Sequence, residues 1–133
     1  MAGRSKTITQ TVTVPAPRSK VYEAFASPKI HAAFTGAAAT GAARVGGKFT
    51  AWDGYIFGVF RALVKDKKIV QDWSTTEWPE GASPSRAEFT FKSVKGGTEV
   101  RLVHSKVPGE QADAYRRGWL DYYWTPLQTY FSK

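Results

Sequence analysis

The sequence predicts an α+β fold in which a curved, largely antiparallel β-sheet wraps around one long C-terminal helix. Segments in which apolar and polar residues alternate outnumber segments with helical spacing, and short turn signals separate them. An aromatic stripe at helical spacing occupies the region beyond Pro108. Because strands joined by short turns pair as antiparallel neighbours, and because their apolar face needs a covering layer, we expect the last helix to lie on the concave face of the sheet.

The first third of the chain predicts one strand, two short helices and a weaker segment. In residues 7–14 threonines alternate with aliphatic residues and Gln10, which is typical of a half-buried strand. Pro17 fits the start of a helix, and helical spacing follows until a Ser-Pro pair interrupts it. We predict a second short helix over 29–34, then a weak strand and a loop in the Ala- and Gly-rich residues 35–47.

From residue 48 onward the pattern predicts a meander of strands. Asp53-Gly54 between two apolar runs is a strong hairpin signal, and Lys65-Asp66-Lys67 and Gly96-Gly97 mark further turns. The predicted strands are 48–52, 55–64, 69–75, 86–91 and 98–104. Because every second residue of a strand points to the same side, the predicted inner face consists of Phe49, Ala51, Ile56, Gly58, Phe60, Ala62, Ile69, Gln71, Trp73, Ala87, Phe89, Phe91, Val100, Leu102 and His104.

The C-terminal region predicts a long helix with one wide aromatic face. Its members recur at three- and four-residue steps and are Tyr115, Trp119, Tyr122 or Tyr123, Leu127 and Tyr130. Pro126 is expected to kink this helix, because proline cannot donate a hydrogen bond to the Tyr122 carbonyl. A sheet that holds such a helix is called a helix-grip fold.

Length and composition predict a single domain over residues 1–133, with residues 1–5 flexible. The chain has no cysteine, which excludes disulfides and thiolate chemistry and fits a reducing compartment, so we expect a cytoplasmic location. We find no apolar stretch of the length that a signal peptide or a membrane span requires.

The charge predicts an acidic partner. Nineteen Lys and Arg against eleven Asp and Glu give a formal charge of +8, which attracts acidic surfaces over a distance. The basic residues are spread along the chain, and only Lys65, Lys67 and Lys68 form a tight group. That group is either a solvated turn or part of a docking surface.

Several short pieces, in their order and spacing, carry a family resemblance. They are Val21-Tyr22, Phe25, Phe34-Thr35-Gly36, Gly46-Gly47-Lys48-Phe49, Asp53-Gly54, Gly58, Ile69-Val70, Trp73, Trp78-Pro79-Glu80-Gly81, Gly97-Thr98-Glu99, Val107-Pro108, Gly118-Trp119 and Tyr122-Tyr123. Together they resemble the C-terminal domain of the activators of the heat-shock protein 90 ATPase, within the START-like (SRPBCC) superfamily.

This resemblance implies a helix-grip fold and a partner. In the eukaryotic members it implies a co-chaperone that speeds ATP turnover by heat-shock protein 90, with a separate N-terminal domain that makes much of the contact. The wider superfamily is known for binding hydrophobic molecules in an internal cavity. We therefore expect a non-catalytic protein that binds heat-shock protein 90, or alternatively a carrier or sensor of a small hydrophobic ligand.

Polar residues on the predicted inner face of the sheet are the candidates for a cavity. Gln10, Gln71 and His104 share faces with apolar residues, and burying them without partners would cost about 1–3 kcal/mol each. They either bond to one another, to backbone or to buried water, or they line a ligand cavity. The candidate cavity residues are Gln10, Phe49, Phe60, Gln71, Trp73, Phe89, His104, Trp119 and Tyr123.

A docking surface is the second candidate site. Trp78 is interpreted either as a turn residue packed on the rim of the sheet or as an exposed aromatic anchor for a partner. The candidate partner-binding residues are Lys65, Lys67, Lys68, Trp78 and Arg86.

Catalytic and metal chemistry find little support. His31 is interpreted as a surface histidine, and neither histidine has a carboxylate or thiolate at metal-ligand spacing. The sequence shows no nucleophile elbow, zinc-protease motif or phosphate-binding glycine loop, so we expect no enzyme activity, metal or cofactor. Nucleic-acid binding has only charge and aromatic residues in its favour, without a recognition motif.

Overall fold

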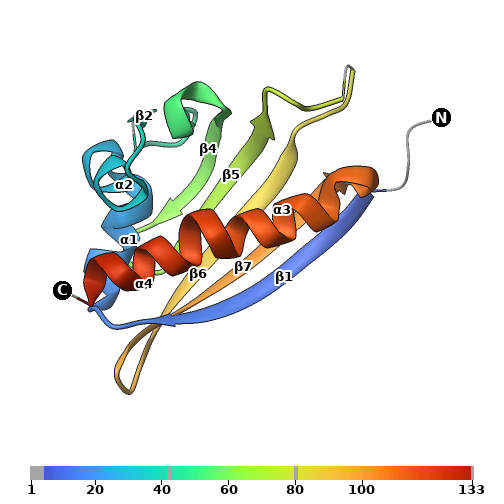
Figure 1. The fold of residues 1–133 in the computed structure, drawn as a ribbon. Helices are drawn as coiled ribbons and strands as arrows, with labels where there is room; N and C mark the ends of the chain where they lie inside the picture. The colour runs from blue at the N-terminus through green and yellow to red at the C-terminus, as the bar shows by residue number, and fades with distance from the viewer. Residues whose placement is uncertain (1–4, 42, 80, 133) are drawn as a thin grey trace.

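A computed structural model describes residues 5–41, 43–79 and 81–132. Seven strands form one antiparallel sheet in the order β1-β7-β6-β5-β4-β3-β2 (Figure 1). The strands are β1 Ser5–Val14, β2 Thr40–Gly41, β3 Lys48–Ala51, β4 Ile56–Val64, β5 Lys68–Thr75, β6 Ser85–Val94 and β7 Gly97–Pro108. Two short helices, α1 Arg18–Ala26 and α2 Pro28–Thr35, follow β1. This order confirms the predicted α+β helix-grip fold.

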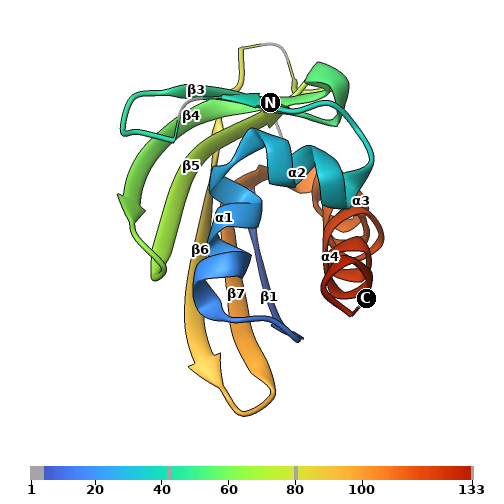
Figure 2. The same ribbon diagram turned by 90° about the vertical axis from the view of Figure 1, so that its left-hand side faces the viewer.

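The C-terminal helix lies along the open side of the curved sheet. It consists of α3 Ala112–Trp119, a π-helical segment Leu120–Trp124 and α4 Thr125–Phe131, after a 3₁₀ turn at Gly109–Gln111. Figure 2 shows the sheet bending around α1 and α2, with the C-terminal helix beside them. None of the helices in the part of the chain that the structure describes is long and apolar enough to cross a membrane.

The irregularity predicted at Pro126 takes the form of a wide turn just before it. The Thr125 N–H donates to the Leu120 carbonyl, five residues back, where a regular helix would bond four residues back. Pro126 has no N–H and its ring would crowd a regular turn. The helix therefore continues past the proline with a local widening.

The alternation underestimates the lengths of β1, β6 and β7. β6 runs to Val94 and β7 to Pro108, because the polar residues at their ends still have paired neighbours on the sheet. Ser5, predicted to be flexible, pairs with Pro108 in β1, so the prediction for this residue is wrong. Residues 1–4, which carry the rest of that prediction, lie outside the described residues.

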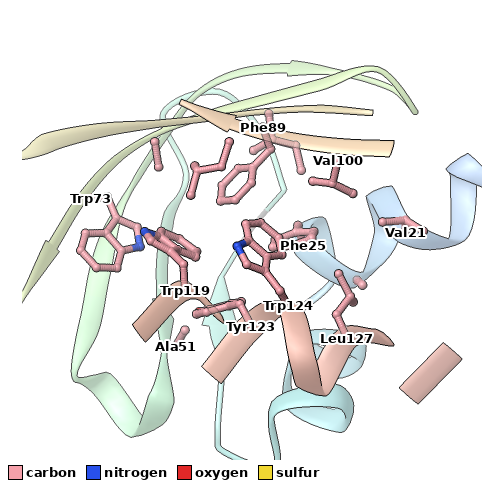
Figure 3. Packing of buried hydrophobic residues seen from close by; sticks show 14 of the residues in the cluster. Val21, Phe25, Ala51, Trp73, Phe89, Val100, Trp119, Tyr123, Trp124 and Leu127 are labelled. Atoms are coloured by element: carbon pink, nitrogen blue, oxygen red, sulfur yellow. The ribbon is translucent and has the colours of Figure 1, made fainter. Parts of the chain in front are cut away.

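The core lies between the concave face of the sheet and the C-terminal helix. Figure 3 shows Trp119, Tyr123 and Trp124 of the helix facing Phe89 of β6, with Phe25 of α1 beside them. The predicted inner faces of β3, β5, β6 and β7 are buried as expected.

A bulge corrects the predicted inner face of β4. The register of β4 against β5 shifts between Phe60 and Ala62, so that Leu63 pairs with the inward-facing Ile69. Because one extra residue reverses the alternation, Leu63 packs against the core in place of the predicted Ala62.

Candidate functional site

The main cavity lies between the C-terminal helix and one end of the sheet. It has a volume of about 580 Å³ and opens to solvent on one side. Most of its wall is aromatic, and its thirteen lining residues are Trp52, Tyr55, Ile56, Trp73, Glu77, Glu110, Gln111, Ala114, Tyr115, Gly118, Trp119, Tyr122 and Tyr123. A space of this volume fits a small organic molecule.

One face of the C-terminal helix forms half of the wall. Gln111, Tyr115, Trp119 and Tyr123 (or the adjacent Tyr122) recur at four-residue steps and so lie on one side of the helix. Small residues stand between them, at positions 114 and 118. A side chain added at Gly118 would meet only the Tyr122 ring, at 3.8 Å, so this part of the cavity is empty because the residue is glycine.

Hydrogen bonds fix the polar groups at the rim of the cavity. The Tyr55 hydroxyl donates to the Glu77 carboxylate, and the Gln111 Nε2 donates to the Glu77 carbonyl over 2.9 Å. The Tyr115 hydroxyl donates to Gln111 Oε1 over 2.9 Å and lies 2.7 Å from Thr75 Oγ1. Burial raises the pKa of both tyrosines, so their hydroxyls are protonated donors at neutral pH.

His104 closes the floor of the cavity from behind in a chain of hydrogen bonds. Trp119 Nε1 donates to His104 Nδ1 over 3.0 Å, and Ser85 Oγ donates to the Trp73 carbonyl over 2.6 Å. The remaining contact, 2.7 Å between His104 Nε2 and Ser85 Oγ, must therefore be donated by the histidine. Burial lowers the pKa of His104 to about 3, so its ring is neutral. In this neutral form each ring nitrogen takes part in one hydrogen bond, Nδ1 as acceptor and Nε2 as donor.

His31 is buried, so the prediction of a surface histidine is wrong. Its exposed fraction is 8%, and its Nε2 lies 2.9 Å from the Tyr123 hydroxyl. Burial lowers the pKa of His31 to about 4 and raises that of Tyr123. The spacing to Phe34, three residues along the same helix, places both rings on one face, with centroids 5.2 Å apart, and could have revealed the burial.

The buried indole N–H of Trp52 also approaches this pair. Its interaction with the Tyr123 hydroxyl lowers the pKa of that hydroxyl, against the larger effect of burial. It forms no hydrogen bond of normal geometry, however, and within the described residues it is the buried side-chain polar atom without a partner.

Three of the nine predicted cavity residues line this cavity: Trp73, Trp119 and Tyr123. A second space of about 10 Å³ is lined in part by Phe49, Phe60 and Gln71. The remaining three lie elsewhere: Phe89 is core, His104 stands behind the wall, and Gln10 bonds to the helix on the side of β1. Gln10 donates to the Arg116 carbonyl over 3.0 Å and accepts from Trp124 Nε1 over 2.7 Å.

The structure does not bring the predicted docking residues together in one surface. Lys65 and Lys67 lie in the turn between β4 and β5, and Lys68 begins β5. Figure 2 shows this turn at the lower left and the end of β5 near the top. Trp78 lies beyond that end, about 25 Å from the turn for a strand of eight residues, whereas Arg86 pairs with Asp72 in the middle of β5, about 13 Å from Lys68.

Trp78 and Arg86 both contact neighbouring residues of the same fold. Trp78 is half-buried, its ring lies 6.1 Å from Trp73 and 5.9 Å from Tyr115, and its N–H donates to the Ser83 carbonyl over 2.9 Å. Arg86 Nη2 lies 3.4 Å from the Asp72 carboxylate. Glu80 of the same loop lies outside the described residues. These contacts favour the interpretation of Trp78 as a residue packed on the rim.

The predicted cavity residues leave out ten of the thirteen wall residues. Trp52, Tyr55, Glu77, Glu110 and Gln111 come from turns and from the start of the helix, where no periodicity marks an inward side. Within residues 5–41, 43–79 and 81–132, no three His, Cys, Asp or Glu side chains are grouped in a way that could hold a metal ion.

A family model and curated proteins with similar sequences indicate the same family. The sequence model described as "Activator of Hsp90 ATPase homolog 1-like protein" matches residues 15–132. The "Activator of 90 kDa heat shock protein ATPase homolog 1" of Homo sapiens is 35% identical over 112 residues, which are 84% of this chain and 33% of that protein. This chain thus spans about a third of the length of the curated relatives that it matches.

Solved structures share the fold over the full length. An HSP90 activator from Plasmodium falciparum superposes with a TM-score of 0.84 at 27% identity, covering 98% of this chain and 97% of that one. The Aha1 dimer from Colwellia psychrerythraea superposes with a TM-score of 0.77 at 17% identity, covering 92% and 93% of the two chains. The latter likeness concerns the fold alone.

Proposed function

The chain belongs to the family of activators of the Hsp90 ATPase, and from this premise we propose that it binds Hsp90 as a non-catalytic co-chaperone and stimulates its ATPase. The match to the family over residues 15–132 is the observation that carries the proposal. The named relatives support the same partner. We also propose that the protein acts in the cytoplasm, in keeping with its lack of cysteine.

The lysine turn, defined as Lys65, Lys67 and Lys68, is the surface that we assign to the chaperone. Lys65 and Lys67 are exposed, while Lys68 is half-buried with its Nζ 3.6 Å from Glu88 Oε2. An exposed basic turn on a chain of charge +8 suits an acidic surface on the partner. Such an attraction accelerates association and weakens as salt is added.

The test is the ATPase rate of Hsp90 with and without this protein, at low and at physiological salt, together with direct binding. We expect a salt-sensitive increase in rate. The double variant Lys65→Glu/Lys67→Glu should lose it, whereas Lys6→Glu/Lys29→Glu, which changes the net charge equally at two other exposed positions, should keep it. No binding of the native chain at either salt concentration would refute the proposal.

A second candidate function is the carriage of a small hydrophobic molecule. The observation that favours it is the cavity of about 580 Å³ with its aromatic wall. A ligand that binds only the folded chain raises its melting temperature by mass action. A library of small apolar compounds that leaves the melting temperature unchanged would count against this function.

A further inference from the structure

We propose that the cavity binds an organic cation, namely a quaternary or protonated ammonium group on an apolar or aromatic body. This inference rests on the second candidate function, ligand binding in the cavity, and names the chemical class of the ligand. Two features of the wall, its charge and its rings, favour a cation, and the backbone of Trp52 favours a ligand site at this place.

The charge of the cavity is opposite to that of the protein. The chain carries nineteen basic against eleven acidic residues, yet the described lining residues include Glu77 and Glu110 and no Lys, Arg or His. Both carboxylates are exposed at the rim. The basic protein as a whole repels a cation, but the two carboxylates attract it at the cavity. An anion is repelled by the same carboxylates.

The rings of the wall are arranged to offer both faces and edges. Trp73 and Tyr115 stand at 87° with centroids 5.4 Å apart, and Trp52 and Tyr122 stand at 73° with centroids 5.3 Å apart. Seven aromatic rings line this one space, and a cation within about 6 Å of a ring centroid is attracted to the ring face, as in aromatic cages for quaternary ammonium groups. Tyr115 stays neutral at pH 7, since burial raises the pKa of its hydroxyl.

The backbone at Trp52 is held in an unfavourable conformation. Its φ is +52° and that of Asp53 is +58°, a region that bulky side chains rarely adopt. Asp53 holds the turn: its Oδ1 accepts from the Ala38 N–H over 2.9 Å, and its own N–H donates to the Ala38 carbonyl over 3.0 Å. Strain that the surroundings maintain is concentrated at ligand sites, and here it places an indole in the wall of the cavity.

The test compares two probes of the same shape, phenyltrimethylammonium and its neutral carbon analogue tert-butylbenzene. Both are titrated into the native chain, and the indole N–H signals are followed by NMR. We expect the cation to bind at least about tenfold more tightly than the neutral analogue. The signals of Trp52, Trp73 and Trp119 should shift more than that of Trp124, which does not line the cavity but stacks on Trp119.

Matched variants locate the interaction. Glu77→Gln and Glu110→Gln should each weaken cation binding by about threefold at low salt, while Glu23→Gln, an exposed position of α1 outside the wall, should not. Tyr122 is 57% exposed, so Tyr122→Leu should fold normally and weaken cation binding, with Tyr130→Leu on the same helix as control. None of these changes should affect the neutral probe by more than about twofold.

Each outcome has one meaning. Equal binding of the two probes would overturn the inference and leave the cavity as a site for neutral apolar molecules. Failure of both probes to bind would overturn the inference and the second candidate function together. Cation binding that persists in the Glu77→Gln/Glu110→Gln variant, without a shift of the wall indoles, would place the cation elsewhere and overturn the inference.

Discussion

Acid should unfold this protein through its two buried histidines. Lowering the pH from 7.5 to 5.0 is expected to remove about 4 kcal/mol from the free energy of unfolding, about 2 kcal/mol for each histidine. The reason is that His31 and His104 are buried in their neutral forms, with pKa values lowered by burial from 6.5 to about 4 and about 3. A loss of this size is a large part of the stability of a small domain.

The direction follows from proton binding. Between pH 6.5 and 4 the unfolded chain protonates both histidines, while the folded chain protonates neither. Unfolding therefore takes up protons, and acid favours it. The stabilisation is fully present above pH 6.5 and is lost as the pH falls toward 4 for His31 and toward 3 for His104.

Urea unfolding at pH 7.5, 6.5, 5.5 and 5.0, followed by tryptophan fluorescence, measures the effect. His31→Gln and His104→Gln should each lose only about 2 kcal/mol over the same range, because one proton site is removed. The comparison separates the histidines from the carboxylates, which are common to all three chains. A native chain that loses less than about 1 kcal/mol between pH 7.5 and 5.0 would show that the folded state protonates its histidines, and would refute the argument.

Three further substitutions test the packing. Gln10→Leu should lower the free energy of unfolding by about 1–3 kcal/mol in urea titrations, because Trp124 Nε1 loses its acceptor; no change would mean that water replaces it. Gly58→Ala should cost about 3 kcal/mol or more, since the added Cβ would stand 1.8 Å from the Asp72 carbonyl oxygen, and a native-like melting curve would contradict this contact. Trp78→Ala should cost about 2 kcal/mol through lost packing, whereas an unchanged melting temperature would restore the interpretation as an exposed anchor.

The fold was predictable because its main signals are local. Alternation in the strands, the turn pair at Asp53-Gly54 and the helical aromatic stripe all act over a few residues, and the structure confirms the elements that they predict. The misplaced inner residue of β4 has a non-local cause: the bulge after Phe60 depends on how β4 pairs with β5. The length of β7 likewise depends on Ser5, about a hundred residues earlier, which supplies the paired neighbour of Pro108.

The site was predictable only in part. The sequence indicated that His104 and Gln10 need partners, but their partners lie 15 to 114 residues away and follow from the packing of the helix on the sheet. The carboxylates of the cavity gave no signal at all, because Glu77 and Glu110 are exposed residues in turns and resemble any solvated acid. Only the folded structure shows that both carboxylates line the rim of the same cavity.

The two proposed surfaces lie at opposite ends of β5, and this separation makes the proposals independent. The lysine turn lies at the start of the strand and Glu77 follows its end, at a distance of about 25 Å along eight residues. Salt at physiological strength screens charges beyond about 8 Å, so the acidic rim of the cavity does not weaken the attraction of an acidic partner to the lysine turn. Loss of Hsp90 binding in the lysine variants and loss of cation binding in the glutamate variants therefore report on different surfaces, and either proposal can fail while the other stands.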